Sequence, residues 1–148
     1  MYKRVLVATD GSELSGRAVA AAIDLAVLTG ADLVSINVAH LHAYSTFEGA
    51  MVLNQREIES AQEQANLAAQ RLVDSVTSLA AAKGVRRTQA IVVKSNQVGE
   101  SIIATAKSEQ CDLIVMASHG RRSFARLLMG SETLHVLTHS HIPVLVLR

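Results

Sequence analysis

The chain has 148 residues and 49% of them are hydrophobic, which is enough for one domain with a substantial core. Its 14 basic and 13 acidic side chains nearly cancel, and it contains two Tyr, two Phe and no Trp. This balance argues against the one-sided basic field that nucleic acids or anionic membranes require, and it leaves few rings for stacking bases.

The cysteine content and the apolar runs both favour a location inside the cell. Cys111 is the only cysteine, so no internal disulfide can form, as is usual in a reducing compartment. The apolar run from Val5 to Ala8 is too short for a signal-peptide core, and no run approaches the roughly 18 residues needed to span a bilayer. We therefore expect a soluble, cytoplasmic protein with a single domain over residues 1–148.

Short β-rich runs alternate along the chain with stretches of helical period. In chain order, the predicted strands are residues 3–9, 33–38, 90–94, 113–117 and 144–147. The predicted helices are one capped by Ser12 and closed by Gly30, one over about residues 55–83, one marked by Val98, Ile102 and Ala106, and one over residues 132–138. Residues 39–54 lack a clear period and are predicted to form a loop that could cover a site.

This alternation is typical of βαβ units, and it predicts an α/β fold with a mainly parallel sheet and helices on both faces. In such a sheet a ligand binds outside the carboxyl ends of the strands, at the point where the strand order reverses. Two segments follow predicted strands closely, residues 9–12 after the first and residues 117–120 after the fourth. Periodicity alone does not say whether they are neighbours.

The second of these segments leads into two glycines that flank a basic stretch. Gly120 can take backbone angles closed to other residues, and Gly130 followed by Ser131 can start a helix whose free N–H groups attract phosphate. The alternative is a simple turn at Gly120 and an ordinary helix start at Gly130. Spacing does not separate the two interpretations.

These residues resemble the universal stress protein family, specifically its ATP-binding branch, over almost the whole chain. Residues 5–12, Val-Leu-Val-Ala-Thr-Asp-Gly-Ser, are similar to the family's first strand and turn, and residues 142–147 are similar to its last strand. The family motif is Gly, two residues, Gly, nine residues, Gly, then Ser or Thr. Its last part is matched by Gly120, Gly130 and Ser131, whereas Ala117 replaces the first glycine.

The resemblance implies a five-stranded parallel sheet of order 3-2-1-4-5, of the adenine nucleotide alpha hydrolase-like, Rossmann-like type. It also implies an ATP site in which the first loop borders the adenosine, the backbone near Val38 meets the adenine edge, and the second loop holds the phosphates. The residues so implied are Ala8, Thr9, Asp10, Val38, Ala117, His119, Gly120, Arg121, Gly130, Ser131, Glu132 and Thr133.

Several side chains of this implied site have a second interpretation. Asp10 could coordinate magnesium or manganese on the phosphates, or it could cap the first helix. Arg121, with the arginines that follow it, could neutralise phosphate or be solvated surface. His119 could contact a phosphate or the metal, or be a structural hydrogen-bonding group. His135 and His139 lie four residues apart without the glutamate of the zinc hydrolase pattern, so no metal site is predicted there.

The leading functional hypothesis is an ATP-binding stress-response or regulatory protein with slow or absent hydrolysis. The Walker A pattern is missing, and no residue is evident that would orient an attacking water. The alternatives are a nucleotide-independent dimerisation module, a weak ATPase of the same fold, and an enzyme of the related α-hydrolase fold. A receiver domain is disfavoured because the third predicted strand ends in Lys94 and Ser95, with no aspartate to accept phosphate.

The last predicted strand, residues 144–147, would leave an unpaired apolar edge that invites association. The resemblance implies that two such strands pair antiparallel across a twofold axis. We therefore expect a homodimer joined through the C-terminal strand.

Overall fold

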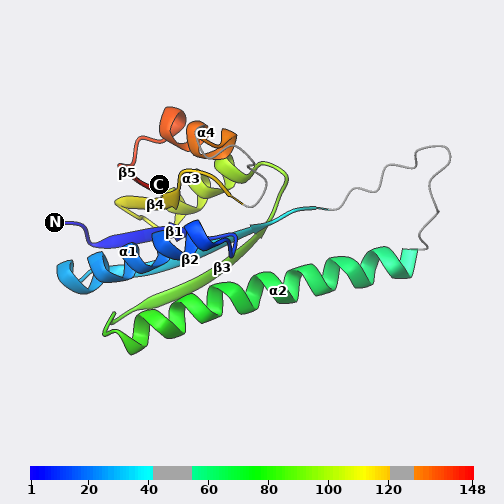
Figure 1. Ribbon diagram of the computed structural model, residues 1–148, viewed down its shortest axis with the longest axis horizontal. Coiled ribbons are helices and arrows are strands. Elements are labelled where there is room, and N and C mark those ends of the chain that lie inside the picture. Colours follow the sequence, from blue (N-terminus) through cyan, green and yellow to red (C-terminus); the bar gives the residue numbers. More distant parts are fainter. Residues whose placement is uncertain (42–54, 121–128) are drawn as a thin grey trace.

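The computed structural model describes residues 1–41, 55–120 and 129–148 (Figure 1). Its strands are β1 (Arg4–Ala8), β2 (Asp32–Ala39), β3 (Thr88–Lys94), β4 (Leu113–Ala117) and β5 (Val144–Leu147). Its helices are α1 (Glu13–Thr29), α2 (Gln55–Ala82), α3 (Val98–Ser108) and α4 (Ser131–His139). Every predicted strand and helix is present, while residues 42–54 of the predicted loop lie outside the described residues.

The strands form one five-stranded sheet of order β3-β2-β1-β4-β5, and all its pairs are parallel. The order expected from the family resemblance is therefore confirmed. It reverses between β1 and β4, since β2 follows β1 on one side and β4 pairs with β1 on the other. The carboxyl ends of β1 and β4 consequently lie side by side, and the loops that follow these strands start from the same point.

Two hydrophobic clusters cover the two faces of the sheet because successive strand residues point to opposite sides. On one face, Val5 and Val7 of β1 join a cluster with α1 and the second half of α2. On the other face, Leu6 joins a cluster with α3 and α4. Figure 1 shows the same three-layer arrangement, with helices on both sides of the sheet.

Residues close in sequence cap both ends of α1. The Ser12 hydroxyl accepts a hydrogen bond from Ser15 N at 3.2 Å and so caps the start of the helix. Gly30 ends it with φ of 70°, a left-handed conformation, and its N–H donates to Ala26 O. Both predicted caps are confirmed.

The helix α2 is much longer than the sheet it covers, and its first half extends past the strands (Figure 1). Its buried residues, Ala69, Val73, Val76 and Ala80, all lie in its second half. There the Ser35 hydroxyl of β2 donates to Val73 O at 3.1 Å and fixes the helix on the sheet. The middle of α2 is thereby held above the carboxyl end of β2.

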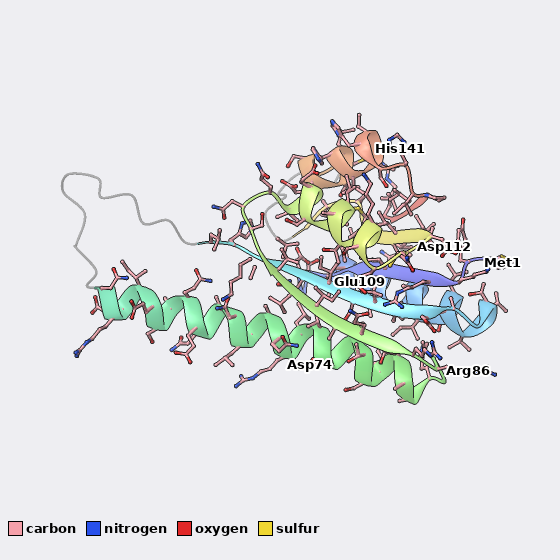
Figure 2. All side chains as sticks on the ribbon, turned by 180° about the vertical axis from the view of Figure 1, so that it is seen from behind. Met1, Asp74, Arg86, Glu109, Asp112 and His141 are labelled. Atoms are coloured by element: carbon pink, nitrogen blue, oxygen red, sulfur yellow. The ribbon has the colours of Figure 1, made fainter. Side chains whose placement is uncertain are left out.

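A charged network lies at the amino ends of the strands. The Arg4 guanidinium contacts Glu109 at 3.1 Å, and the carboxylate of Asp112 accepts hydrogen bonds from the backbone N–H groups of Lys3 and Arg4. Figure 2 places Asp112 and Met1 together at this end of the sheet. None of the helices in the described part of the chain is long and apolar enough to cross a membrane.

Candidate functional site

A cavity of about 1300 Å³ lies at the carboxyl ends of β1, β2 and β4. The predicted site residues that fall in the described ranges all line it: Ala8, Thr9, Asp10, Val38, Ala117, His119, Gly120, Gly130, Ser131, Glu132 and Thr133. Arg121, like Arg122 and Arg126, lies outside the described residues. The fold therefore gathers residues from four separate parts of the sequence at one place.

The turn after β1 is organised by its own side chains. Buried Thr9 hydrogen-bonds through its hydroxyl to Ser15 Oγ at 3.1 Å and accepts from Gly11 N at 3.2 Å. Asp10 Oδ1 accepts from Ser12 N at 2.9 Å, which closes an Asx-type turn. The cap of α1 is Ser12 rather than Asp10, so the Asp10 carboxylate supports the turn that precedes the helix.

The contact between Asp10 and Gly120 joins the two loops across the switch point. A β-carbon added to Gly120 would lie 2.5 Å from Asp10 Oδ2, closer than any real side chain could approach. The reason for the glycine differs from the one predicted. Among the described glycines, those with positive φ are Gly11, Gly30 and Gly84, so Gly120 leaves space for the Asp10 carboxylate rather than adopting unusual backbone angles.

The start of α4 presents backbone amides to the cavity. Gly130 is its N-cap residue, in extended conformation with φ of −63° and ψ of 149°, and as a glycine it makes no side-chain cap. The amides of Ser131, Glu132 and Thr133 precede the first intrahelical hydrogen bond, which runs from Leu134 N to Gly130 O at 2.9 Å. Uncapped amides at a helix start, together with the helix dipole, make a binding site for anions.

Two further hydrogen bonds hold this helix start against β4. Gly130 N donates to Ser118 O at 2.8 Å, and the buried Thr133 hydroxyl donates to Ala117 O at 2.9 Å. A β-carbon on Gly130 would be 3.4 Å from Ser118 O and from His119 Cα. A side chain at residue 130 would therefore face the loop after β4.

The end of β2 offers backbone groups beside the end of β1. Ile36 O accepts from Thr9 N, on the β1 side, whereas Ala39 O accepts from Ser95 N, on the β3 side. Since backbone groups alternate in direction along a strand, those of Val38 point toward β1, which has already ended at Ala8. They border the cavity and are available to the edge of a ligand.

An apolar part of the cavity adjoins these groups. Ile36 and Val38 of β2 and Met116 of β4 face the α3 side of the sheet, where Val98 and Ile102 of α3 complete the lining. Such a mixture of apolar walls and a few backbone donors is typical of sites for small organic ligands. The arrangement separates an apolar region near β2 from the polar region at α4.

Several residues of the lining were not predicted from the sequence. The Asn37 side chain donates to Thr9 O at 2.8 Å and links β2 to the turn after β1. The middle of α2 supplies Ala65, Ala68, Ala69, Arg71 and Leu72, and His40 follows the end of β2. A polar Asn inside an apolar strand was a usable signal, but nothing local in the helix indicated which of its turns would meet the cavity.

Three polar side chains have partners that the sequence did not indicate. His119 Nδ1 lies 3.1 Å from Ser118 Oγ, and the Glu132 carboxylate accepts from Gly99 N at 2.6 Å. His135 stacks on His139 with ring centroids 4.2 Å apart and contacts Glu100 at 3.3 Å. Within residues 1–41, 55–120 and 129–148, no three His, Cys, Asp or Glu side chains gather so as to hold a metal ion.

A parallel, doubly wound sheet whose strand order reverses at a cavity bordered by a helix start defines the Rossmann-like class of α/β folds. Within that class the chain belongs to the universal stress protein family, whose sequence profile matches residues 1–148.

Individual relatives agree with this family membership. Universal stress protein MJ0531 of Methanocaldococcus jannaschii is 31% identical over 100% of this chain and 83% of its own length. Universal stress protein YxiE of Bacillus subtilis is 28% identical over 100% of both chains. Among solved structures, UspA from Lactobacillus plantarum superposes with a TM-score of 0.83 at 22% identity, covering 99% of this chain and 98% of that one.

Proposed function

We propose that this protein binds ATP in the cavity at the switch point and acts as a cytoplasmic stress-response or regulatory protein with little or no ATP hydrolysis. The observation that carries the proposal is the start of α4. There the consecutive amides of Ser131, Glu132 and Thr133 receive no side-chain cap from the N-cap residue, Gly130, and they border the same cavity as Asp10 and Gly120. Amides so placed suit the phosphates of a nucleotide.

The apolar part of the cavity suits the adenosine. An adenine ring would lie among Ile36, Val38 and Met116, with the outward-pointing backbone groups of Val38 at its edge. Two solved neighbours support an adenine nucleotide, a universal stress protein in complex with cAMP and one from Archaeoglobus fulgidus in complex with dAMP. Their TM-scores to this chain are 0.69 and 0.62.

A magnesium or manganese ion fits this site as a companion of the phosphates. Asp10 supplies one carboxylate, whose Oδ1 also accepts from Ser12 N and whose Oδ2 faces Gly120. Magnesium in nucleotide sites is usually held by one or two carboxylates, the phosphates and waters, so a single aspartate is sufficient. When bound, the ion would neutralise part of the phosphate charge.

The polar side chains of the lining favour binding over hydrolysis. Rapid ATPases orient an attacking water with a suitably placed side chain. Here His119 Nδ1 is within hydrogen-bond distance of the Ser118 hydroxyl, and the Glu132 carboxylate accepts from Gly99 N. Both groups are engaged in contacts within the protein rather than positioned to orient a water, which supports slow or absent hydrolysis.

A pair of substitutions at Ser131 tests the phosphate site directly. Proline is well tolerated at the first position of a helix, and the extended Gly130 before it already has compatible angles, so Ser131→Pro removes one amide donor while keeping α4. Ser131→Ala is the matched control that removes only the hydroxyl. We expect Ser131→Pro to weaken ATP binding by about 10-fold or more relative to Ser131→Ala, since a hydrogen bond to a charged group is worth about 1.5–3 kcal/mol.

The measurement is calorimetric titration of ATP with and without magnesium, beside mass spectrometry of any nucleotide released when the purified protein is denatured. Circular dichroism would establish that both variants keep their helices. Equal ATP affinity of the proline and alanine variants would contradict the proposed phosphate site.

A homodimer through β5 completes the proposal. Among the strands that the structure describes, β5 pairs only with β4, which leaves its other side at the edge of the sheet. Leu145 of β5 is 40% exposed, and Leu134 and Leu137 of α4 are 56% and 39% exposed. An apolar strand edge beside exposed leucines is suited to pairing with a second copy across a twofold axis.

The second candidate function is a nucleotide-independent dimerisation module. Ala117, where the family motif has glycine, is the observation that favours it, because its methyl group adds bulk to the cavity wall. The strand alternation moderates this effect. Leu113 and Val115 point to the α1 face of the sheet, and by the alternation of the strand the methyl group of Ala117 points to the same face. Met116 points to the opposite face, where it lines the apolar part of the cavity.

A further inference from the structure

Glu132 is a fixed acidic side chain in the wall of the cavity. It is the second residue of α4 and lines the cavity, and its Oε2 accepts a hydrogen bond from Gly99 N at 2.6 Å. Gly99 belongs to the first turn of α3, a helix whose N-cap residue, Gln97, makes no side-chain cap. One carboxylate therefore belongs to the start of α4 and serves as the missing cap of α3.

The close fit of the two helices keeps this carboxylate in place. A β-carbon on Gly99 would lie 3.1 Å from Glu132 Oε2 and 3.2 Å from Glu132 O, so only glycine leaves this space free. The next residue, Thr133, is tied to Ala117 O. The backbone on which the carboxylate is carried is thus held to β4, and its head group is held to α3.

This carboxylate is carried by the same helix start at which a phosphate would bind. The start of α4 carries about half a positive charge from the helix dipole, and an acidic side chain in the first turn offsets part of it. Any anion bound at the amides of Ser131–Thr133 then lies within a helical turn of the residue that carries this carboxylate. The resulting repulsion grows with the charge of the anion, because Coulomb energy is proportional to the product of the charges.

We propose that Glu132 makes the site selective for the charge of its ligand, disfavouring a metal-free triphosphate relative to a metal-complexed triphosphate or a monophosphate. The inference rests on the proposed function, because it assumes that phosphates occupy the start of α4. It adds a residue that determines which charge state of an adenine nucleotide the site retains.

The test is Glu132→Gln, which keeps an oxygen to accept from Gly99 N and removes only the charge. ATP with EDTA, ATP with magnesium, and AMP are titrated into the wild type and the variant. We expect metal-free ATP to bind about two- to fivefold more tightly to the variant, as for a charge at a helix terminus, and AMP to gain less. Magnesium should then improve ATP affinity by a smaller factor in the variant, and the differences should shrink at high salt.

Two further variants isolate the charge. Glu59→Gln makes the same change in net charge on the exposed first half of α2, outside the cavity lining, and should leave all three affinities unchanged. Glu132→Ala also removes the acceptor for Gly99 N, so α4 loosens. It should bind all three ligands more weakly than Glu132→Gln does.

The outcomes separate this inference from the proposal on which it rests. An unchanged preference between ATP and AMP in Glu132→Gln, or the same change in Glu59→Gln, would overturn the role of Glu132 and leave the nucleotide site standing. Absence of binding of any of the three ligands by both the wild type and Glu132→Gln would overturn the site itself, and this inference with it.

Discussion

The contact between Asp10 and Gly120 is where single atoms decide the geometry of the site. Asp10 Oδ1 supports the turn before α1, and its Oδ2 occupies the space that a side chain at residue 120 would need. The carboxylate can hold this position only while residue 120 has no β-carbon. Two loops that are 110 residues apart in the chain thus depend on one another's side-chain size.

Gly120→Ala should therefore displace the Asp10 carboxylate and weaken nucleotide binding by several-fold, with little loss of stability because a flexible side chain gives way. Gly16→Ala is a matched control, since Gly16 lies in α1 with nothing within 4 Å of the added carbon. That control should stabilise the protein by about 0.5–1 kcal/mol through helix propensity. Titration with ATP and thermal unfolding of both variants measure the two effects, and unchanged affinity in Gly120→Ala would show that Asp10 is not needed.

Burial controls the chemistry of Cys111. The side chain is 6% exposed, and loss of hydration raises the pKa of its thiol to about 11 from 9.0, despite the opposing influence of Arg4. At pH 8 the native protein should react slowly with iodoacetamide, whereas the denatured protein should react readily. Rapid labelling of the native protein, followed by mass spectrometry, would contradict this expectation.

The same pKa shift has a consequence for stability. The folded state keeps the thiol proton to a higher pH than the unfolded state does, so the associated stabilisation is complete below pH 9.0 and is lost as the pH rises toward about 11. Cys111→Ala should remove this contribution to the pH dependence of the free energy of unfolding between pH 9.0 and about 11, as measured by denaturant unfolding.

At the scale of elements, the packing of α3 against α4 determines how the amides that we propose to bind phosphate are presented. Gly99 allows the two helices to approach so closely that Glu132 O and His135 occupy the space of a side chain. Hydrogen bonds then attach the start of α4 to α3 through Glu132 and to β4 through Thr133. The helix is positioned by its neighbours as much as by its own sequence.

Gly99→Ala should destabilise the protein by about 1 kcal/mol or more, because an added carbon in a close helix contact forces the neighbours apart. Its β-carbon would lie 2.8 Å from His135 Cδ2 and 3.2 Å from the backbone oxygen of Glu132. Denaturant unfolding measures the change, with Gly16→Ala as the control for helix propensity. A gain in stability for both variants would contradict this expectation, because it would mean that α4 moves to accommodate the added carbon without cost.

At the scale of the whole molecule, the edge of the sheet at β5 is the surface through which we propose that the protein dimerises. The sheet ends in this strand on one side, and Leu145 is exposed there. A charged residue on an edge strand opposes edge-to-edge pairing. The monomer fold should tolerate such a residue at this exposed position.

Leu145→Lys should therefore shift the proposed dimer to monomer at micromolar concentration, as measured by analytical ultracentrifugation. Leu28→Lys is the control, because Leu28 is 83% exposed near the end of α1 and does not belong to the edge strand. A wild-type protein that sediments only as a monomer would contradict the proposed dimer, and so would a Leu145→Lys variant that remains dimeric.

Much of the fold and part of the site could be predicted from the residues and their resemblance to a family. The short Val-rich runs, the Ser12 and Gly30 caps and the helix start at Gly130–Ser131 depend on interactions within a few residues of the chain, which a sequence displays directly. The periodicity of the sequence did not predict the strand order, which was predicted from the family resemblance instead. The structure has that order.

Local sequence by itself determined which segments are strands and helices and where a helix start could hold an anion. Only the tertiary structure decided that Gly120 is glycine because Asp10 lies against it, that Glu132 caps α3, and that the middle of α2 forms a cavity wall. The physical reason is distance along the chain. A backbone preference is set by neighbouring residues, whereas the partner of a side chain is set by the packing of elements far apart in sequence.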